Sequence, residues 1–293
     1  MFFIKIFSRL PAFIMFMIAD FLYFVTYYII KYRRAVVEKN LEISFPNISK
    51  KDRKRIIKKF YKNFSDVLIE SLMAISLSKE ELKQRVSYSN KHLVEDCKTR
   101  GFSSVFLATH QCNWEWMHLT GTFQFSYQIV GIYKSLKSDS FGNLMLMVRS
   151  RFGGDMVSSD RIVRNIAKNK NEIRGIGLIG DQRPHIGGKK IWVKMFGHDT
   201  AFHTGVEFIP KMENAAVFIP HMTRKGRGRY HIDMIKLCEP PYNKERPTEI
   251  IEKYASELES IIKKHPSDWL WSHDRWKYTK KEAEPWDKNF EKK

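Results

Sequence analysis

The sequence predicts an α/β protein with a mainly parallel sheet flanked by helices and an N-terminal membrane helix. Two observations carry the fold class: short apolar runs recur between residues 104 and 237, and amphipathic helical stretches lie between them. Strands that alternate with helices favour parallel pairing, because each crossover needs a connection of helix length. A third observation, the long apolar stretch at residues 10–30, sets the N-terminal segment apart.

The N-terminal stretch has the length and composition of a membrane segment. Residues 10–30 read LPAFIMFMIADFLYFVTYYII, with Asp20 as the only charge. Tyr23, Tyr27 and Tyr28 crowd its C-terminal end, as at a membrane interface. Basic residues flank both ends, and no small-residue cleavage site precedes the second basic cluster, which disfavours a signal peptide. A spanning helix and a helix in the interface both fit, and a buried amphipathic helix is the alternative.

A long amphipathic helix is predicted over residues 56–75, with Ser49 or Asp52 as its N-cap. Its outward Lys and Arg are either a solvated face or a contact for lipid headgroups. Further helices are expected from their periodicity and end signals at 91–100, 114–125, 141–151, 162–168 and 247–264. Strands are expected from their apolar runs at 104–108, 129–133, 173–179, 191–196, 215–219 and 230–237.

The composition indicates a folded, strongly basic protein. Hydrophobic residues make up 43% of 293 residues, enough for a real core. Lys plus Arg number 51 against 32 Asp plus Glu, a net charge of +19, which favours an anionic partner: a membrane surface, a phosphorylated lipid, an acidic carrier protein or nucleic acid. The three widely spaced cysteines form neither a metal signature nor a disulfide framework and favour a reducing compartment.

One glycine pattern invites a nucleotide-binding interpretation that the context rejects. Residues 175–180 spell Gly-x-Gly-x-x-Gly, but the glycines lie within an apolar run. The dinucleotide fingerprint needs a strand before the glycines and a helix that opens on them. Here a loop containing Pro184 follows, so no nucleotide site is expected.

The most informative residues lie where the strand at 104–108 ends. His110 follows that strand, Asn113 is a good N-cap for the next helix, and Glu115 lies five residues after the histidine. An imidazole at a strand exit with a nearby carboxylate is a base with its orienting acid. Such a pair can take a proton from a hydroxyl that attacks an acyl group.

His110-x-x-Asn-Trp-Glu115 resembles the hallmark of the glycerolipid acyltransferase superfamily, in the longer form typical of its lipid A branch, the late secondary acyltransferases. That branch usually has Gly at the position of Cys112. Three further blocks follow in family order: Asp181-Gln182, the Phe-Gly segment at 196–201, and Trp-Leu-Trp-Ser-His-Asp-Arg-Trp-Lys at 269–277. The resemblance covers residues 1–278. It divides the chain into a membrane-anchoring helix (1–34), an acyltransferase domain (35–278) and a charged tail (279–293) that we expect to be frayed.

The resemblance implies transfer of an acyl chain from a thioester on acyl carrier protein to a hydroxyl of a lipid A precursor or related glycolipid. It makes His110 the general base and Glu115 the residue that orients it. It implies a bacterial inner membrane location with the active site facing the cytoplasm, and no metal or other cofactor. The expected substrate-binding residues are Asn113, Arg149, Arg151, Asp181 and Gln182.

Several alternatives remain open at the level of sequence. The acceptor could be another lysolipid or an aminolipid, or the chain could be a non-enzymatic basic protein that binds anionic lipid or nucleic acid. Nucleic acid is not expected, because no nucleic-acid recognition motif is present. The tryptophans of 269–277 are expected to be structural. The basic hairpin tip at 224–229 is expected to face solvent, with docking of an acidic carrier as the sharper alternative.

Overall fold

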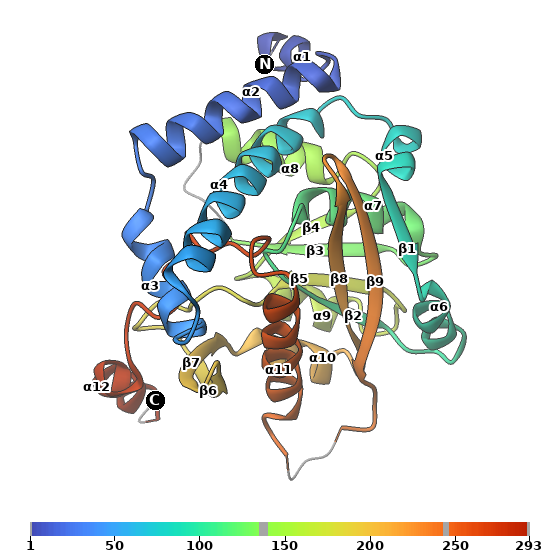
Figure 1. Ribbon diagram of the computed structural model, residues 1–293. Helices are drawn as coiled ribbons and strands as arrows, with labels where there is room; N and C mark the ends of the chain where they lie inside the picture. Colours follow the sequence, from blue (N-terminus) through green and yellow to red (C-terminus); the bar gives the residue numbers. More distant parts are fainter. Residues whose placement is uncertain (1, 135–139, 243–245, 292–293) are drawn as a thin grey trace.

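A sheet of seven strands organises the protein (Figure 1), as seen in a computed structural model that describes residues 2–134, 140–242 and 246–291. Neighbouring strands are parallel except for the antiparallel β8–β9 hairpin. The predicted mainly parallel sheet is thereby confirmed. The strands in spatial order are β1 (Val86–Ser89), β9 (Arg229–Cys238), β8 (Ala216–Gly226), β2 (Ser104–Ala108), β5 (Gly175–Ile179), β3 (Ile129–Tyr133) and β4 (Asp155–Ser158).

Helices flank this sheet, and the predicted ones are all present. Elements outside the ranges predicted above are the helices at residues 2–7, 34–44, 79–85, 205–212 and 280–291 and the strands at 86–89, 155–158 and 198–203. The helices are α1 (Phe2–Phe7), α2 (Ala12–Phe24) with a π-helical turn (Val25–Ile29), α3 (Arg34–Ser44), α4 (Lys50–Met73), α5 (Lys79–Arg85), α6 (Lys91–Thr99), α7 (Trp114–Gln124), α8 (Ser140–Arg149), α9 (Ile162–Lys168), α10 (Gly205–Met212), α11 (Glu249–Lys264) and α12 (Lys280–Glu291).

The strand predicted at 191–196 exists, but it lies outside the main sheet. It is β6 (Lys190–Met195), which pairs antiparallel with β7 (His198–His203) in a separate hairpin. Phe196 and Gly197 form the two-residue turn with φ of 50° and 76°. Two successive left-handed residues match the twist of a hairpin, which explains the Phe-Gly segment of the sequence.

Helix α4 begins as predicted and connects the two main parts of the core. The Ser49 hydroxyl accepts the backbone N–H of Asp52 at 3.0 Å, so Ser49 is the N-cap. Near its start, Ile57 packs in the same cluster as the C-terminal tryptophans. Near its end, Ile69 packs with two residues of α2, Met15 and Ala19. The N-terminal helix is therefore docked on the folded domain. By length and composition, residues 12–29 are also long and apolar enough to cross a membrane.

The expectation of a frayed C-terminal tail is wrong for residues 280–291, which form α12. Ala283 is fully buried, and Asp287 accepts hydrogen bonds from Lys190 and from the Trp192 indole N–H. Both partners belong to β6 of the separate hairpin. Local composition could not reveal this helix, because its stability comes from packing on a hairpin some ninety residues earlier in the chain.

Candidate active site

His110 and Asp181 meet because their strands are neighbours. β2 and β5 are parallel with Ala108 opposite Ile179, so the residues two positions further along leave the sheet at the same edge. Asp181 Oδ2 accepts the backbone N–H of His110 at 2.7 Å, and Oδ1 accepts the ring Nδ1–H at 2.6 Å. Proton donation from Nδ1 leaves Nε2 as the basic nitrogen. The Gln182 side-chain amide lies 3.1 Å from it.

The environment of Asp181 favours its ionised form. Burial raises the pKa of this carboxyl, since the side chain is only 1% exposed. The charge and hydrogen bonds of His110 and the Trp269 indole N–H outweigh burial, and the net pKa is below its usual value. A carboxylate held ionised next to imidazole fixes the tautomer and stabilises the imidazolium that forms when Nε2 accepts a proton.

The C-terminal motif holds this dyad in place. Trp269 donates its indole N–H to Asp181 Oδ2 at 2.8 Å and pairs with Gln111 in an isolated β-bridge. The Asp268 carbonyl accepts the backbone N–H of Cys112 at 2.9 Å. Trp269 is thus part of the site, although the sequence suggested only a structural role. Its signal was the run of rare residues at 269–277.

His273 of the same motif is a structural acceptor. Its Nε2 accepts the backbone N–H of Arg183 at 2.9 Å, which ties the motif to the loop after Asp181. Burial, with a further contribution from the positive charge of Arg275, lowers its pKa to about 4. The ring is therefore neutral at pH 7, as an acceptor of a backbone N–H requires.

Glu115 does not orient His110, contrary to the expectation from the five-residue spacing. Its carboxylate forms a two-point ion pair with Arg149, at 2.9 Å to Nε and 2.5 Å to Nη2. Across the ranges that the structure describes, no hydrogen bond joins Glu115 to His110. The physical reason is that Nδ1 is already taken by Asp181. The Glu115 side chain is 8% exposed and the Arg149 side chain 28%.

Two expected substrate-binding residues are occupied elsewhere. Asn113 is fully buried: its Oδ1 accepts the Trp116 backbone N–H as the predicted N-cap, and its Nδ2 donates to Glu70 at 2.8 Å. Arg151 donates to the carbonyl of Ala74, at the end of α4. Asn113 thus supports the turn at residues 109–113, the candidate catalytic turn, and Arg151 ties the residues after α8 to the end of α4. That either residue also binds a substrate stays a prediction.

Cys112 has a left-handed backbone with φ of 55° and is 2% exposed. Glycine adopts this conformation without strain, which explains why the resembling branch usually has Gly at this position. The Sγ atom lies 3.4 Å from the Met222 carbonyl of β8. The departure from Gly therefore places a small side chain into the core below the catalytic turn.

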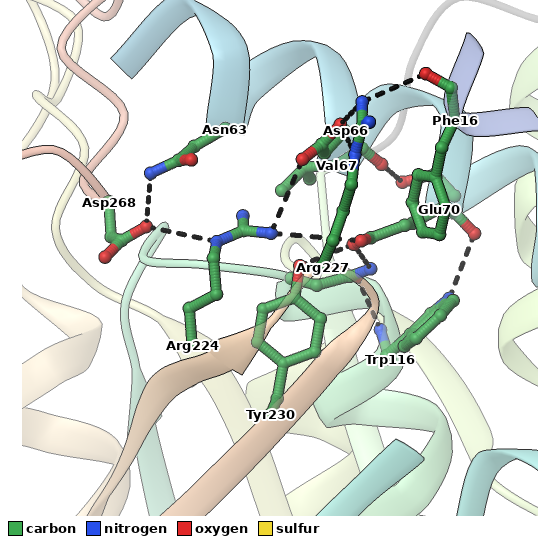
Figure 2. Close-up of polar contacts among 12 residues, drawn as sticks. Phe16, Asn63, Asp66, Val67, Glu70, Trp116, Arg224, Arg227, Tyr230 and Asp268 are labelled. Atoms are coloured by element: carbon green, nitrogen blue, oxygen red, sulfur yellow. Dashed lines mark hydrogen bonds and ion pairs between the residues drawn. The ribbon is translucent and has the colours of Figure 1, made fainter. Parts of the chain in front are cut away.

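A buried polar cluster supports the catalytic turn from the side of α4 (Figure 2). Glu70 is fully buried, and its Oε2 accepts from Asn113 and from the Tyr230 hydroxyl at 2.5 Å. Arg224 of β8 lies 3.8 Å from Asp66 and 3.9 Å from Glu70, with its side chain 12% exposed. Burial raises the pKa of Glu70, which Arg224 partly offsets. In sequence, Glu70 looks like an ordinary polar helix residue and gave no signal.

The hairpin arginines were expected to face solvent, and for two of them this is wrong. Arg224 faces the buried acids just described. Arg227 binds Asp66 at 2.6 Å and Asp20 of α2 at 2.8 Å (Figure 2). The tip of the β8–β9 hairpin lies against α4 and α2, so these side chains bind internal carboxylates. Lys225 and Arg229 remain exposed.

A small cavity lies beside His110. It has a volume of about 10 Å³, with room for about one water, and lies between the catalytic turn and α4. A lipid chain does not fit in it without movement of the surrounding side chains. Its walls include His110, Cys112, Trp114, Phe60, Phe64, Val67 and Arg224.

The chain is similar to known proteins over most of its length. A profile described as "bacterial lipid A biosynthesis acyltransferase" matches residues 1–278. The chain is 23% identical over 261 residues to a lipid A biosynthesis lauroyltransferase of Escherichia coli, covering 87% of this chain and 82% of that protein. It is 21% identical over 251 residues to a lipid A biosynthesis acyltransferase of Haemophilus influenzae, covering 82% of this chain and 74% of that protein. The chain belongs to the bacterial lipid A biosynthesis acyltransferase family.

Proposed function

We propose that this acyltransferase moves a fatty acyl chain from a thioester on acyl carrier protein to a hydroxyl of a lipid A precursor, with His110 as general base and Asp181 as its orienting acid. The observation that carries the proposal is the hydrogen bond between Nδ1 of His110 and Asp181, which leaves Nε2 basic beside Gln182. The family and its named relatives support the substrate class.

The geometry supports a simple proton cycle. The acceptor hydroxyl takes the place of the Gln182 amide at Nε2 of His110 and gives up its proton as its oxygen attacks the thioester carbonyl carbon. The tetrahedral intermediate collapses, the carbon–sulfur bond breaks, and the thiolate receives the proton from the imidazolium. Asp181 stabilises the imidazolium throughout, as the acid does in a hydrolase triad.

The Glu115–Arg149 pair supports the intermediate in this proposal. Glu115 accepts from Nε and Nη2 of Arg149, which fixes the guanidinium plane and leaves the two N–H groups of Nη1 and the second N–H of Nη2 outside this ion pair. A fixed donor is suited to stabilise an oxyanion or to bind a phosphate, because it needs no reorganisation during the reaction. Glu115 thus acts through Arg149 as a positioning residue. Backbone N–H groups at the start of α7 are the second source of donors.

We place the enzyme at the bacterial inner membrane with its active site facing the cytoplasm. The apolar helix α2 supports membrane association. The free thiols of Cys97, Cys112 and Cys238 fit a reducing compartment. An acidic carrier suits the net charge of +19.

Mass spectrometry of lipid A tests the function directly. Cells that lack the gene should accumulate lipid A short of one acyl chain, and the wild-type gene should restore it. A His110→Ala gene should not, although the protein is made and stays folded. Restoration by His110→Ala would overturn the assigned base, and unchanged lipid A in the deletion would overturn the acceptor class.

A further inference from the structure

Helix α2, with the π-helical turn that follows it, lies along α4 over its whole length. A few residues before α2 begins, the Ser8 hydroxyl lies 2.5 Å from the Ser76 hydroxyl, just beyond the end of α4. At its end, Tyr27 packs edge-on against Tyr61 with ring centroids 5.4 Å apart. Met15 and Ala19 between these points are fully buried against the domain. Figure 1 shows α2 at the edge of the molecule, with α4 on its inner side.

A set of ion pairs near the middle of α2 holds the two helices together. Arg227, from the β8–β9 hairpin, binds Asp20 of α2 and Asp66 of α4 together, and it donates to the Phe16 carbonyl at 3.0 Å (Figure 2). The Asp20 side chain is 47% exposed. If residues 12–29 crossed a bilayer, the Asp20 carboxylate would lie near the hydrocarbon midplane. Its partner Arg227, at the tip of the β8–β9 hairpin, would then also have to enter the hydrocarbon layer. Charged groups at that depth are costly.

The opposite face of α2 is apolar and uncovered. Its members recur at intervals of three and four residues, so they form one stripe along the helix. They are Phe13, Met17, Phe21 and Phe24, with exposed fractions of 66%, 66%, 68% and 50%. Large aromatic side chains in a continuous stripe mark an interaction surface and not ordinary scattered surface residues.

A stripe of cations on α4 adjoins this apolar face. An open groove of about 420 Å³ has Tyr23 of α2 as one wall and six basic residues of α4 as the other. Positions four apart carry like charges, which repel one another on an isolated helix. Among the residues that the structure describes, the only ion pairs of this stripe are Arg55 with Asp52 and Lys62 with Asp20. The six are Lys51, Lys54, Arg55, Lys58, Lys59 and Lys62.

We propose that α2 lies in the plane of the membrane and does not span it. Its Phe and Met stripe enters the acyl layer, and the α4 cations bind the phosphates of anionic lipid headgroups in the groove beside Tyr23. An apolar stripe next to a cationic one is the pattern of an interfacial helix, although here the two stripes come from different helices. The inference refines the membrane association of the proposed function, and its tests do not measure acyl transfer, so the two can fail separately.

The first test is topology. Both ends of an in-plane helix lie on one side of the membrane, whereas the ends of a spanning helix lie on opposite sides. Arg9→Cys and Lys50→Cys, both at exposed positions flanking α2, are made in a full-length Cys238→Ser background, because Cys97 and Cys112 are buried. An impermeant maleimide is applied to spheroplasts and to inverted vesicles. Labelling of both cysteines from the same side supports the inference, and labelling from opposite sides overturns it.

The second test is lipid charge. Lys54→Glu/Lys58→Glu should lower binding of the full-length protein to phosphatidylcholine vesicles containing phosphatidylglycerol by about tenfold or more at low salt, since each cation near the surface contributes substantially. The matched control Lys168→Glu/Lys170→Glu changes the net charge equally at two exposed positions near the end of α9.

The outcomes separate the partners. Headgroup binding is supported if the α4 variant, and not the α9 control, binds phosphatidylglycerol vesicles more weakly, and if this difference is absent on pure phosphatidylcholine vesicles. An equal loss of vesicle binding in both variants would show that only the net charge matters, and it would overturn the assignment of the α4 cations to lipid headgroups. Normal vesicle binding by the α4 variant, with weakened binding to an acidic carrier protein, would also overturn it and assign the stripe to the carrier.

Discussion

Asp181 accepts two hydrogen bonds from a single residue, His110, one from the backbone N–H at 2.7 Å and one from ring Nδ1 at 2.6 Å. The carboxylate therefore fixes both the position of the catalytic turn and the orientation of the ring. This relationship depends on the adjacency of β2 and β5, and it assigns to Asp181 the part that Glu115 was expected to play.

Asp181→Asn should lower kcat by about 10²- to 10⁴-fold, because an amide can favour the wrong imidazole tautomer and cannot stabilise the imidazolium. The measurement is turnover of a carrier-bound thioester, with thermal unfolding as the control for folding. Activity within a few-fold of wild type would mean that another group orients His110.

Glu115→Gln and Arg149→Gln should not have independent effects, because the two side chains form one ion pair. We expect each single variant to lose activity and the double variant to lose little more than the worse single one, a coupling of about 0.5–3 kcal/mol. A double-mutant cycle on kcat measures it. If the loss of activity in the double variant equalled the product of the two single losses, the Glu115 carboxylate and the Arg149 guanidinium would act independently.

His273 should make stability sensitive to acid. Its folded pKa is about 4, against 6.5 for the free side chain, because burial and Arg275 disfavour the charged form. The unfolded chain therefore binds a proton that the folded one does not: this contribution is intact above about pH 6.5 and is lost as the pH falls toward 4.

His273→Gln keeps an acceptor for the Arg183 N–H and removes the titration. The drop in thermal midpoint between about pH 7.5 and about pH 5 should be smaller in this variant than in wild type. Some pH dependence should remain, because burial also lowers the pKa values of His203 and His221 to about 4. An identical drop in both proteins would contradict the assignment.

Cys112→Gly should fold and stay active, with stability within about 1 kcal/mol of wild type, because relief of the left-handed strain offsets the lost side chain and the added freedom of the unfolded chain. Cys112→Val should be clearly less stable, since a β-branched residue is poorly accommodated at φ of 55°. Thermal unfolding of the pair decides. Equal stability of the two variants would show that the backbone conformation differs.

Glu70→Ala should destabilise the protein by about 3–5 kcal/mol, because it leaves Asn113 and Tyr230 without their buried acceptor and removes one of the acids near the Arg224 guanidinium. Glu42→Ala is the matched control: it removes the same group from an exposed ion pair with Arg53, where the loss should stay below about 1 kcal/mol. Chemical unfolding measures both. A loss for Glu70→Ala as small as the control would show that the cluster adds nothing to stability.

The fold class and most of the helices and strands could be predicted from local patterns in the chain. The strands 104–108 and 129–133 and the helix 162–168 have the predicted bounds, because apolar periodicity and end signals are local properties. The same holds for His110 at a strand exit and for Asn113 as the N-cap of α7. The family resemblance, carried by rare residues at fixed spacing, is confirmed along residues 1–278.

Which side chains come into contact depends on the packing of the whole chain. The chain separates His110 from Asp181 by 71 positions and Glu70 from Arg224 by more than twice that, so no local spacing encodes either contact. Strand order brings His110 and Asp181 together, and the packing of the β8–β9 hairpin against α4 brings Glu70 and Arg224 together. Glu115 was the natural partner of His110 in sequence, yet β5 supplies an acid nearer to Nδ1. An ion pair or a hydrogen bond depends on distances of a few ångströms, which only the packed chain sets.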